Sequence, residues 1–178
     1  MRSWWVRAVL ALTRQGFPGK AARQLISAGV ADWTKDTLLA IQRLFPPGDT
    51  SQVPVLSSSS DHFSEEEVLE ALKRMKRGKS PGPSGLRTEH LNDLVAHQTC
   101  GHLVSEGLTS FVNAVAFGDC PRELAAVLNV GRAVPLLKPD NTIRPLVVGE
   151  TLRNLVATCW NGRVLADLEE ALAPRHLG

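Results

Sequence analysis

Apolar residues recur three and four positions apart along most of this chain, and turn-forming residues separate the stretches. This spacing predicts amphipathic helices, because 3.6 residues make one helical turn. The predicted helices cover residues 4–12, 21–26, 38–45, 65–77, 86–95, 103–117, 124–130 and 152–172. A mainly helical protein is therefore expected.

One segment of the chain lacks the helical spacing. Two short apolar runs, residues 134–137 and 143–148, are joined by the polar turn residues Pro139, Asp140 and Asn141. Apolar runs of this length on either side of such a turn predict a β-hairpin. The expected fold class is thus α+β, mostly helical, with one small antiparallel hairpin or sheet.

The helix that begins after Ser64 has the most complete end signals. Ser64 and Glu67 are spaced as a capping box, and Phe63 and Val68 as the hydrophobic staple that accompanies one. Gly78 is expected to end this helix, because glycine favours the left-handed backbone that follows a helical segment.

The helix at 38–45 has a weaker start signal and an aromatic neighbour. Either Asp32 or Thr34 can cap it. Trp33, which stands between them, is expected to lie in the core, since large aromatic side chains are usually buried.

Residues 46–62 form a stretch rich in proline, glycine and serine, with four consecutive serines at 57–60. Such a composition predicts a flexible linker without an element of its own. The expected organisation is therefore an N-terminal helical segment, residues 1–45, followed by a larger region, residues 63–178.

Composition narrows the class of protein only slightly. A chain of 178 residues with 43% hydrophobic content is long enough for a real core, and the net charge is only +2. The basic residues are nevertheless clustered. No acidic residue precedes Asp32, and none falls among the basic residues between 73 and 87, which are Lys73, Arg74, Lys76, Arg77, Lys79 and Arg87. Taken alone, each of these two segments, the acid-free residues before Asp32 and the basic residues at 73–87, is explained by a solvent-exposed face.

Cysteine usage and hydropathy indicate the cellular compartment in which the protein is expected. Three widely spaced cysteines indicate reduced thiols and not a disulfide framework, and no apolar run reaches membrane-spanning length. The expectation is an intracellular protein, nuclear or cytoplasmic, with no membrane partner. The arginine-containing, acid-free start leaves a mitochondrial-type presequence open on composition.

No catalytic or metal site is predicted from the residues themselves. His97, Cys100 and His102 are close in sequence, but they lack the second ligand pair of a structural zinc site. The histidines show no triad pattern with a serine or cysteine nucleophile.

The hairpin carries the candidate binding residues. Lys138 ends the first apolar run, Arg144 opens the second, and each is followed by a proline that biases its backbone toward the extended region. Two such cations suit a polyanion such as a triphosphate. The alternative is a solvated turn with two surface charges.

Two motifs together resemble a known family. They are Lys-Ser-Pro-Gly-Pro-Ser-Gly at 79–85 and Lys-Pro-Asp-Asn-Thr-Ile-Arg-Pro-Leu at 138–146. With the order of helices around them, and the continuation through 149–153 to 172–178, this region resembles the fingers of reverse transcriptases. The resemblance is closest to the enzymes of non-LTR retrotransposons, which are RNA-directed DNA polymerases.

The resemblance implies roles for five residues. Lys138 and Arg144 would bind the triphosphate of an incoming dNTP, and Lys79, Ser80 and Arg87 would line the path of an RNA or DNA template. A phosphate-tracking surface then becomes the favoured interpretation of the basic run. Many relatives have an aspartate where this chain has Ser84, although a serine there can still cap the following helix.

Family members continue into a palm domain, where aspartates on two strands and a Tyr-x-Asp-Asp turn hold two metal ions. This chain contains no tyrosine, and none of its aspartates stands in such a motif. The expectation is a fingers fragment, truncated before the palm and not catalytic alone. It would contain no cofactor, and magnesium is expected only in a full-length polymerase.

Two alternatives stay open beside this hypothesis. One is a non-catalytic helical interaction module, which would meet a palm domain or a second copy through the apolar stripe of the C-terminal helix. The other is a nonfunctional remnant of a retroelement that does not fold stably.

Overall fold

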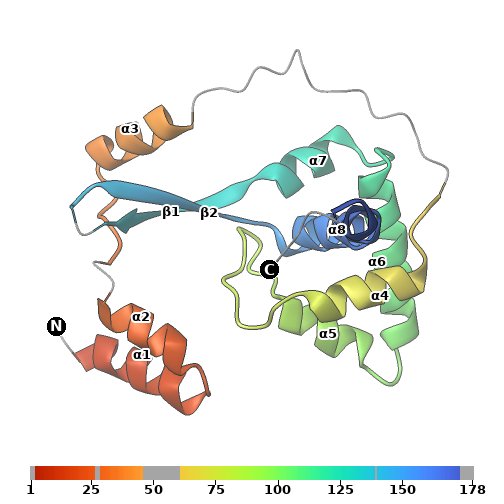
Figure 1. Cartoon of the computed structure of the whole chain (residues 1–178), viewed down its shortest axis with the longest axis horizontal. Helices are drawn as coiled ribbons and strands as arrows, with labels where there is room; N and C mark the ends of the chain where they lie inside the picture. The colour runs from red at the N-terminus through yellow and green to blue at the C-terminus, as the bar shows by residue number, and fades with distance from the viewer. Residues whose placement is uncertain (1–2, 27–28, 46–60, 139, 173–178) are drawn as a thin grey trace. The chain divides into compact units, whose positions relative to one another are not determined.

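The computed structural model describes residues 3–26, 29–45, 61–138 and 140–172 (Figure 1). Two compact units make up the chain: Met1–Gln52 with Ala133–Val147, and Val53–Arg132 with Val148–Gly178. Helices predominate in the described residues, and the sheet is a two-stranded antiparallel one, as the sequence predicted. Most of the predicted linker, residues 46–60, lies outside the described residues, and the predicted domain boundaries stay a prediction.

The first unit contains three helices among its described residues. Helix α1 (Ser3–Arg14) packs against α2 (Pro18–Ile26) after a turn at Gly16, where φ is 79°. Helix α3 (Lys35–Leu44) begins at Thr34, whose Oγ1 accepts the Thr37 N–H at 3.1 Å. Of the two predicted caps, Thr34 is the one used.

The predicted hairpin is confirmed. Strands β1 (Gly131–Leu137) and β2 (Ile143–Gly149) pair antiparallel, and the Lys138 N–H donates to Thr142 O at 2.9 Å beside the turn. Asn141 has a φ of 61°, a left-handed conformation that asparagine tolerates better than most residues.

The outer edge of β1 also has a partner, which the sequence did not reveal. The Ala31 N–H donates to Pro135 O at 2.8 Å, and the Leu137 N–H donates to Gly29 O at 3.0 Å. The segment ahead of α3 is thereby hydrogen-bonded to the hairpin within the first unit.

The prediction that Trp33 lies in the core is wrong, since this side chain is 60% exposed. Along α3 the buried residues are Thr37 and Ile41, whereas Leu38 and Leu44 stay exposed. The physical reason is that apolar character, whether of one aromatic side chain or of a helix face, does not by itself provide a partner that buries it. Within the described residues nothing covers the rest of this face.

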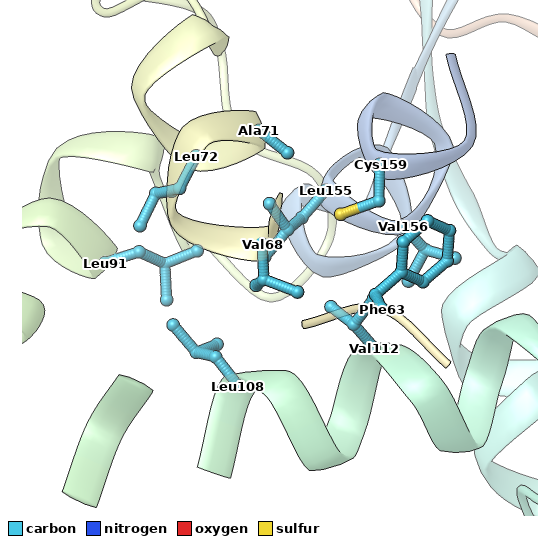
Figure 2. Close-up of a cluster of buried hydrophobic side chains, with 10 residues drawn as sticks. All are labelled: Phe63, Val68, Ala71, Leu72, Leu91, Leu108, Val112, Leu155, Val156 and Cys159. Atoms are coloured by element: carbon cyan, nitrogen blue, oxygen red, sulfur yellow. The ribbon is translucent and has the colours of Figure 1, made fainter. Parts of the chain in front are cut away.

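The second unit is built from five helices of the described residues: α4 (Glu65–Arg74), α5 (Thr88–Val95), α6 (Gly101–Ala116), α7 (Arg122–Asn129) and α8 (Thr151–Leu172). Helix α8 packs against α4, α6 and α7, and α5 packs against α4 and α6. Figure 2 shows the side chains that meet between them. They are Phe63, Val68, Ala71, Leu72, Leu91, Leu108, Val112, Leu155, Val156 and Cys159, each at most 8% exposed.

The start of α4 follows the prediction. Ser64 Oγ accepts the Glu67 N–H at 3.2 Å, and Glu67 Oε2 accepts the Ser64 N–H at 2.8 Å, which completes the capping box. Phe63 and Val68 are both buried in the same core. Asn113 of α6 holds the backbone of Phe63 from both sides, donating to its carbonyl at 3.0 Å and accepting its N–H at 2.7 Å.

The predicted end of α4 is wrong. The helix ends at Arg74 with Met75 as its C-cap, three residues before Gly78. The Gly78 N–H instead donates to the Glu89 carboxylate of α5. Tertiary contact with α5, which local sequence does not encode, thus redirects the chain before the glycine.

Arg163 of α8 ties the start of α4 to the rest of the core. Its guanidinium forms two bonds with the Glu67 carboxylate, at 2.7 and 2.9 Å, and donates to Asp61 O at 2.7 Å and His62 O at 2.8 Å. It also lies 4.0 Å from the centre of the Phe63 ring. The hydrogen bond from Arg163 lowers the pKa of Glu67 from 4.5 to about 2.

None of the helices in the described part of the chain combines the length and the apolar character needed to cross a membrane.

Acid is expected to weaken the second unit through Glu67. Because the pKa of Glu67 is lowered in the folded protein, its ionised form stabilises the fold above pH 4.5, and this stabilisation is lost as the pH falls toward about 2. The Glu67 side chain is 39% exposed, so screening reduces the contribution to about 1–2 kcal/mol. Urea unfolding followed by circular dichroism between these pH values measures it.

Glu67→Gln is expected to flatten this pH dependence. Glu70→Gln is the matched control, because Glu70 lies in the exposed pair with Lys73, and it should leave most of the dependence in place. If the free energy of unfolding depended on pH equally in the unaltered chain and in Glu67→Gln, Glu67 would not be the source of the acid sensitivity.

Candidate nucleic-acid interface

The predicted template residues lie on an irregular segment of the second unit, residues 79–87, which we call the template loop. This loop connects the turn after α4 to the first residue of α5. Lys79, Ser80 and Arg87 are all exposed. In the described part of the chain, neither the Lys79 ammonium nor the Ser80 hydroxyl has a hydrogen-bond or ion-pair partner. Both groups are therefore available to a ligand.

A buried carboxylate from a later part of the sequence binds the middle of this loop. Glu150 is 4% exposed, and its Oε1 accepts the Ser84 N–H at 2.7 Å. Its Oε2 accepts the Ser84 hydroxyl at 2.6 Å. Both oxygens of the carboxylate are thus hydrogen-bonded, which compensates for its removal from water.

Two further contacts join the loop to the same place. The Thr151 hydroxyl, at the first residue of α8, donates to Leu86 O at 2.6 Å. Gly82 is buried against backbone, and a Cβ there would lie 2.7 Å from Gly149 O and 2.9 Å from Glu150 Cα. The loop conformation is consequently fixed at Gly82, Ser84 and Leu86.

The prediction that Ser84 caps the helix of 86–95 is wrong. Helix α5 begins at Thr88, and its N-cap residue is Arg87, whose N–H donates to His90 Nδ1 at 3.4 Å. The Ser84 hydroxyl is engaged by Glu150 and accepts the Leu86 N–H at 3.2 Å. The physical reason is the later start of α5: because the helix begins at Thr88, its N-cap position falls on Arg87, three residues after Ser84.

The predicted triphosphate residues lie on the hairpin of the first unit. Lys138 faces Thr142 across the ladder, so Arg144 faces Leu136, and both cations project from one face of the hairpin as diagonal neighbours. Lys138 is half-buried and Arg144 is exposed. The hairpin pairing therefore sets these two residues on the same face.

A carboxylate belongs to the same turn as the two cations. Asp140 accepts the Thr142 hydroxyl at 2.6 Å and the Thr142 N–H at 3.0 Å. These bonds, and to a lesser degree the charge of Lys138, lower the pKa of the Asp140 carboxyl. A polyanion on the hairpin would compete with Asp140 for Lys138.

The two predicted sets lie in different compact units. Lys79, Ser80 and Arg87 share the template loop of the second unit, and Lys138 and Arg144 share the hairpin of the first. Each set is a candidate group of binding residues within its own unit.

Sequence reasoning missed Glu150 and Thr151 as partners of the loop. The sequence Gly-Glu-Thr before an apolar periodic stretch marks the start of a helix, and the local pattern indicates nothing more. Nothing in it identifies Ser84, 66 residues earlier, as the group that the carboxylate binds.

The described residues contain no group of three metal-ligating side chains. Cys100 Sγ lies 3.3 Å from His97 Nδ1 near the start of α6, which accounts for two of the three residues considered for zinc. Burial raises the pKa of the Cys159 thiol to about 11, so this thiol is a packing group. The chemistry that the loop cations and the hairpin cations offer is anion binding. We assign no catalytic group to either set.

Compared with family models, curated proteins and solved structures, the chain matches none of them. The likeness to reverse transcriptases therefore stays a prediction from the motifs.

Gly82→Ala is expected to destabilise the second unit. The added methyl group would meet backbone atoms of Gly149 and Glu150 that cannot rotate away, and overpacking of this kind costs about 1–3 kcal/mol. Urea unfolding measures the change. Gly107→Ala is the control, because nothing lies within 4 Å of a Cβ at this helical glycine, and there we expect a gain of about 0.5–1 kcal/mol. Equal stability of the two variants would show that the Gly82 contact is not formed.

Proposed function

We propose that the chain is the fingers region of an RNA-directed DNA polymerase of the non-LTR retrotransposon type. In this proposal it holds a template strand and the triphosphate of a dNTP inside the cell, in the nucleus or cytoplasm, and does not catalyse transfer alone. The support is the two motifs and the geometry of the loop and hairpin that carry them. Nucleotidyl transfer would take place in the palm of a full-length polymerase, where a pair of magnesium ions would be bound.

The observation that carries the proposal is a cation displayed on a fixed loop. Lys79 is exposed and has no partner among the described residues, while the loop behind it is fastened by Glu150 and Thr151. Two other cations of the second unit, Arg163 and Lys73, form ion pairs with Glu67 and Glu70. An unpaired cation in a fixed position binds phosphate without first breaking an internal ion pair.

The hairpin supports the triphosphate part of the proposal in the same way. The pairing of the two strands sets Lys138 and Arg144 on one face of the hairpin, so the backbone determines where both side chains begin. Two cations as diagonal neighbours suit two phosphates of one triphosphate, and each charge-assisted hydrogen bond contributes about 1.5–3 kcal/mol.

Removal of a template-loop cation is expected to weaken RNA binding in a salt-dependent manner. In Lys79→Ala or Arg87→Ala, the slope of log affinity against log salt should fall by about 0.7 for each phosphate that the variant no longer neutralises. Fluorescence anisotropy of a labelled single-stranded RNA over a series of KCl concentrations measures the slope. The same series with single-stranded DNA compares the two kinds of template.

Lys73→Ala is the matched control for charge. Its ammonium lies 2.6 Å from Glu70, so its removal should leave the slope almost unchanged. A slope that falls equally in all three variants would indicate attraction to net charge and contradict a template path at the loop.

Triphosphate binding is expected to depend on the hairpin cations. Lys138→Ala and Arg144→Ala should each raise the dissociation constant of a dNTP about ten- to hundredfold, which is the effect of removing one charge-assisted hydrogen bond. Isothermal titration calorimetry measures it. Arg132→Ala removes another exposed cation of β1, six residues from Lys138, and should have little effect. Similar increases in all three variants would contradict the assignment.

A second candidate function has its own supporting observation. Val164 and Leu165 of α8 are 45% and 53% exposed, which leaves apolar surface on the C-terminal helix. A non-catalytic interaction module would use this surface to bind a second copy. Sedimentation that depends on protein concentration, together with absent RNA binding, would favour this function over the first.

A further inference from the structure

We infer that Glu150 is a positioning residue for nucleic-acid binding, because it fixes the loop that presents Lys79 and Ser80 to a template. This inference rests on the proposed function. It goes beyond that function by assigning a role to a buried residue that touches no ligand.

The hydrogen bonds of the Glu150 carboxylate are directed at the loop alone. Both of its oxygens accept hydrogen bonds from Ser84, one from the backbone and one from the side chain. The described residues show no ion pair for it. A buried charge whose bonds all go to one loop residue stabilises a single loop conformation, because any other conformation leaves the charge unsatisfied.

Glu150 can hold the loop in place because it is attached to a helix that is buried in the core. It immediately precedes α8, and its carbonyl accepts the Asn154 N–H at 3.0 Å. The positive end of the helix dipole favours a carboxylate there. Helix α8 is in turn anchored in the core by Leu155 and Val156, which are 0% and 8% exposed. The loop is therefore tied to a deeply buried helix segment of the second unit.

The loop needs such a support. Gly82 and Gly85 give its backbone more freedom than other residues would, and the φ of Gly85 is +77°. Lys79 stands five residues before Ser84 and has no partner of its own among the described residues. The contacts at Gly82, Ser84 and Leu86 hold this stretch from its C-terminal side, and the Gly78 N–H, which donates to the Glu89 carboxylate, holds it just before Lys79.

The experiment uses the whole chain and two measurements. Amide hydrogen exchange at Ser84 reports on the loop without any ligand, and anisotropy of a labelled single-stranded RNA reports on binding. Glu150→Ala is expected to speed exchange at Ser84 and to lower RNA affinity about five- to tenfold. Ser84→Asp should do the same, because it sets a second carboxylate against Glu150.

A compensating variant separates positioning from general loss of stability. In Ser84→Asp combined with Glu150→Gln, the introduced amide can donate to the introduced carboxylate and still accept the backbone N–H of position 84. Affinity and slow exchange are both expected to return to within about twofold of the unaltered chain. Thr158→Ala, which removes a hydrogen bond from α8 to Asn154 O away from the loop, should change neither measurement.

A double-mutant cycle tests the link to Lys79. If Glu150 acts by placing Lys79 and Ser80, the loss of affinity caused by Glu150→Ala should be much smaller in the Lys79→Ala background, where only the contribution of Ser80 is left to lose. Additive decreases in affinity would overturn the inference, as would normal RNA binding by Glu150→Ala or failure of the compensating variant to restore affinity. Absence of RNA binding by the unaltered chain would overturn the proposed function and, with it, this role of Glu150.

Discussion

The packing of α8 against α4 and α6 is the interaction on which the second unit depends. Leu155, Val156 and Cys159 of α8 are almost completely buried against residues of those helices (Figure 2). Burial of apolar side chains is the main stabilising term in a domain of this size. It also places two polar residues, one on α8 and one at its start, within reach of segments far earlier in the chain.

Those two residues connect distant parts of the sequence in different ways. Arg163 reaches Glu67, 96 residues earlier, and secures the entry to α4. Glu150 reaches Ser84, 66 residues earlier, and secures the template loop. The Arg163 contact stabilises the start of a core helix. The Glu150 contact holds a loop whose exposed cation, Lys79, has no partner among the described residues. The same helix thus stabilises the unit and orders its candidate binding surface.

Arg163 and Lys73 form ion pairs within the second unit, whereas the candidate-site cations form none among the described residues. Arg163 and Lys73 are paired with carboxylates, and the former pairing is strong enough to lower the pKa of Glu67 to about 2. Lys79 is left exposed on an ordered loop. On the hairpin, Asp140 keeps partial electrostatic contact with Lys138, so an anion binding there would replace a weak interaction with a stronger one.

The sequence by itself determined the features that depend on nearby residues. The helical periodicities, the capping box of Ser64 and Glu67, and the hairpin around Asp140 and Asn141 all follow from spacing within a few positions, because caps, turns and periodic faces are local. The positions of Lys138 and Arg144 on one face follow from the same hairpin register. The identity of the exposed loop cations was also evident from the sequence.

Only the tertiary structure decided what depends on segments distant in sequence. The early end of α4, the exposure of Trp33, the pairing of residues 29–31 with β1 and the use of Ser84 by Glu150 each require a partner that local pattern does not specify. A buried carboxylate must find hydrogen-bond donors wherever the fold supplies them. Which loop supplies them is settled by how helices pack, and that information is spread over the whole unit.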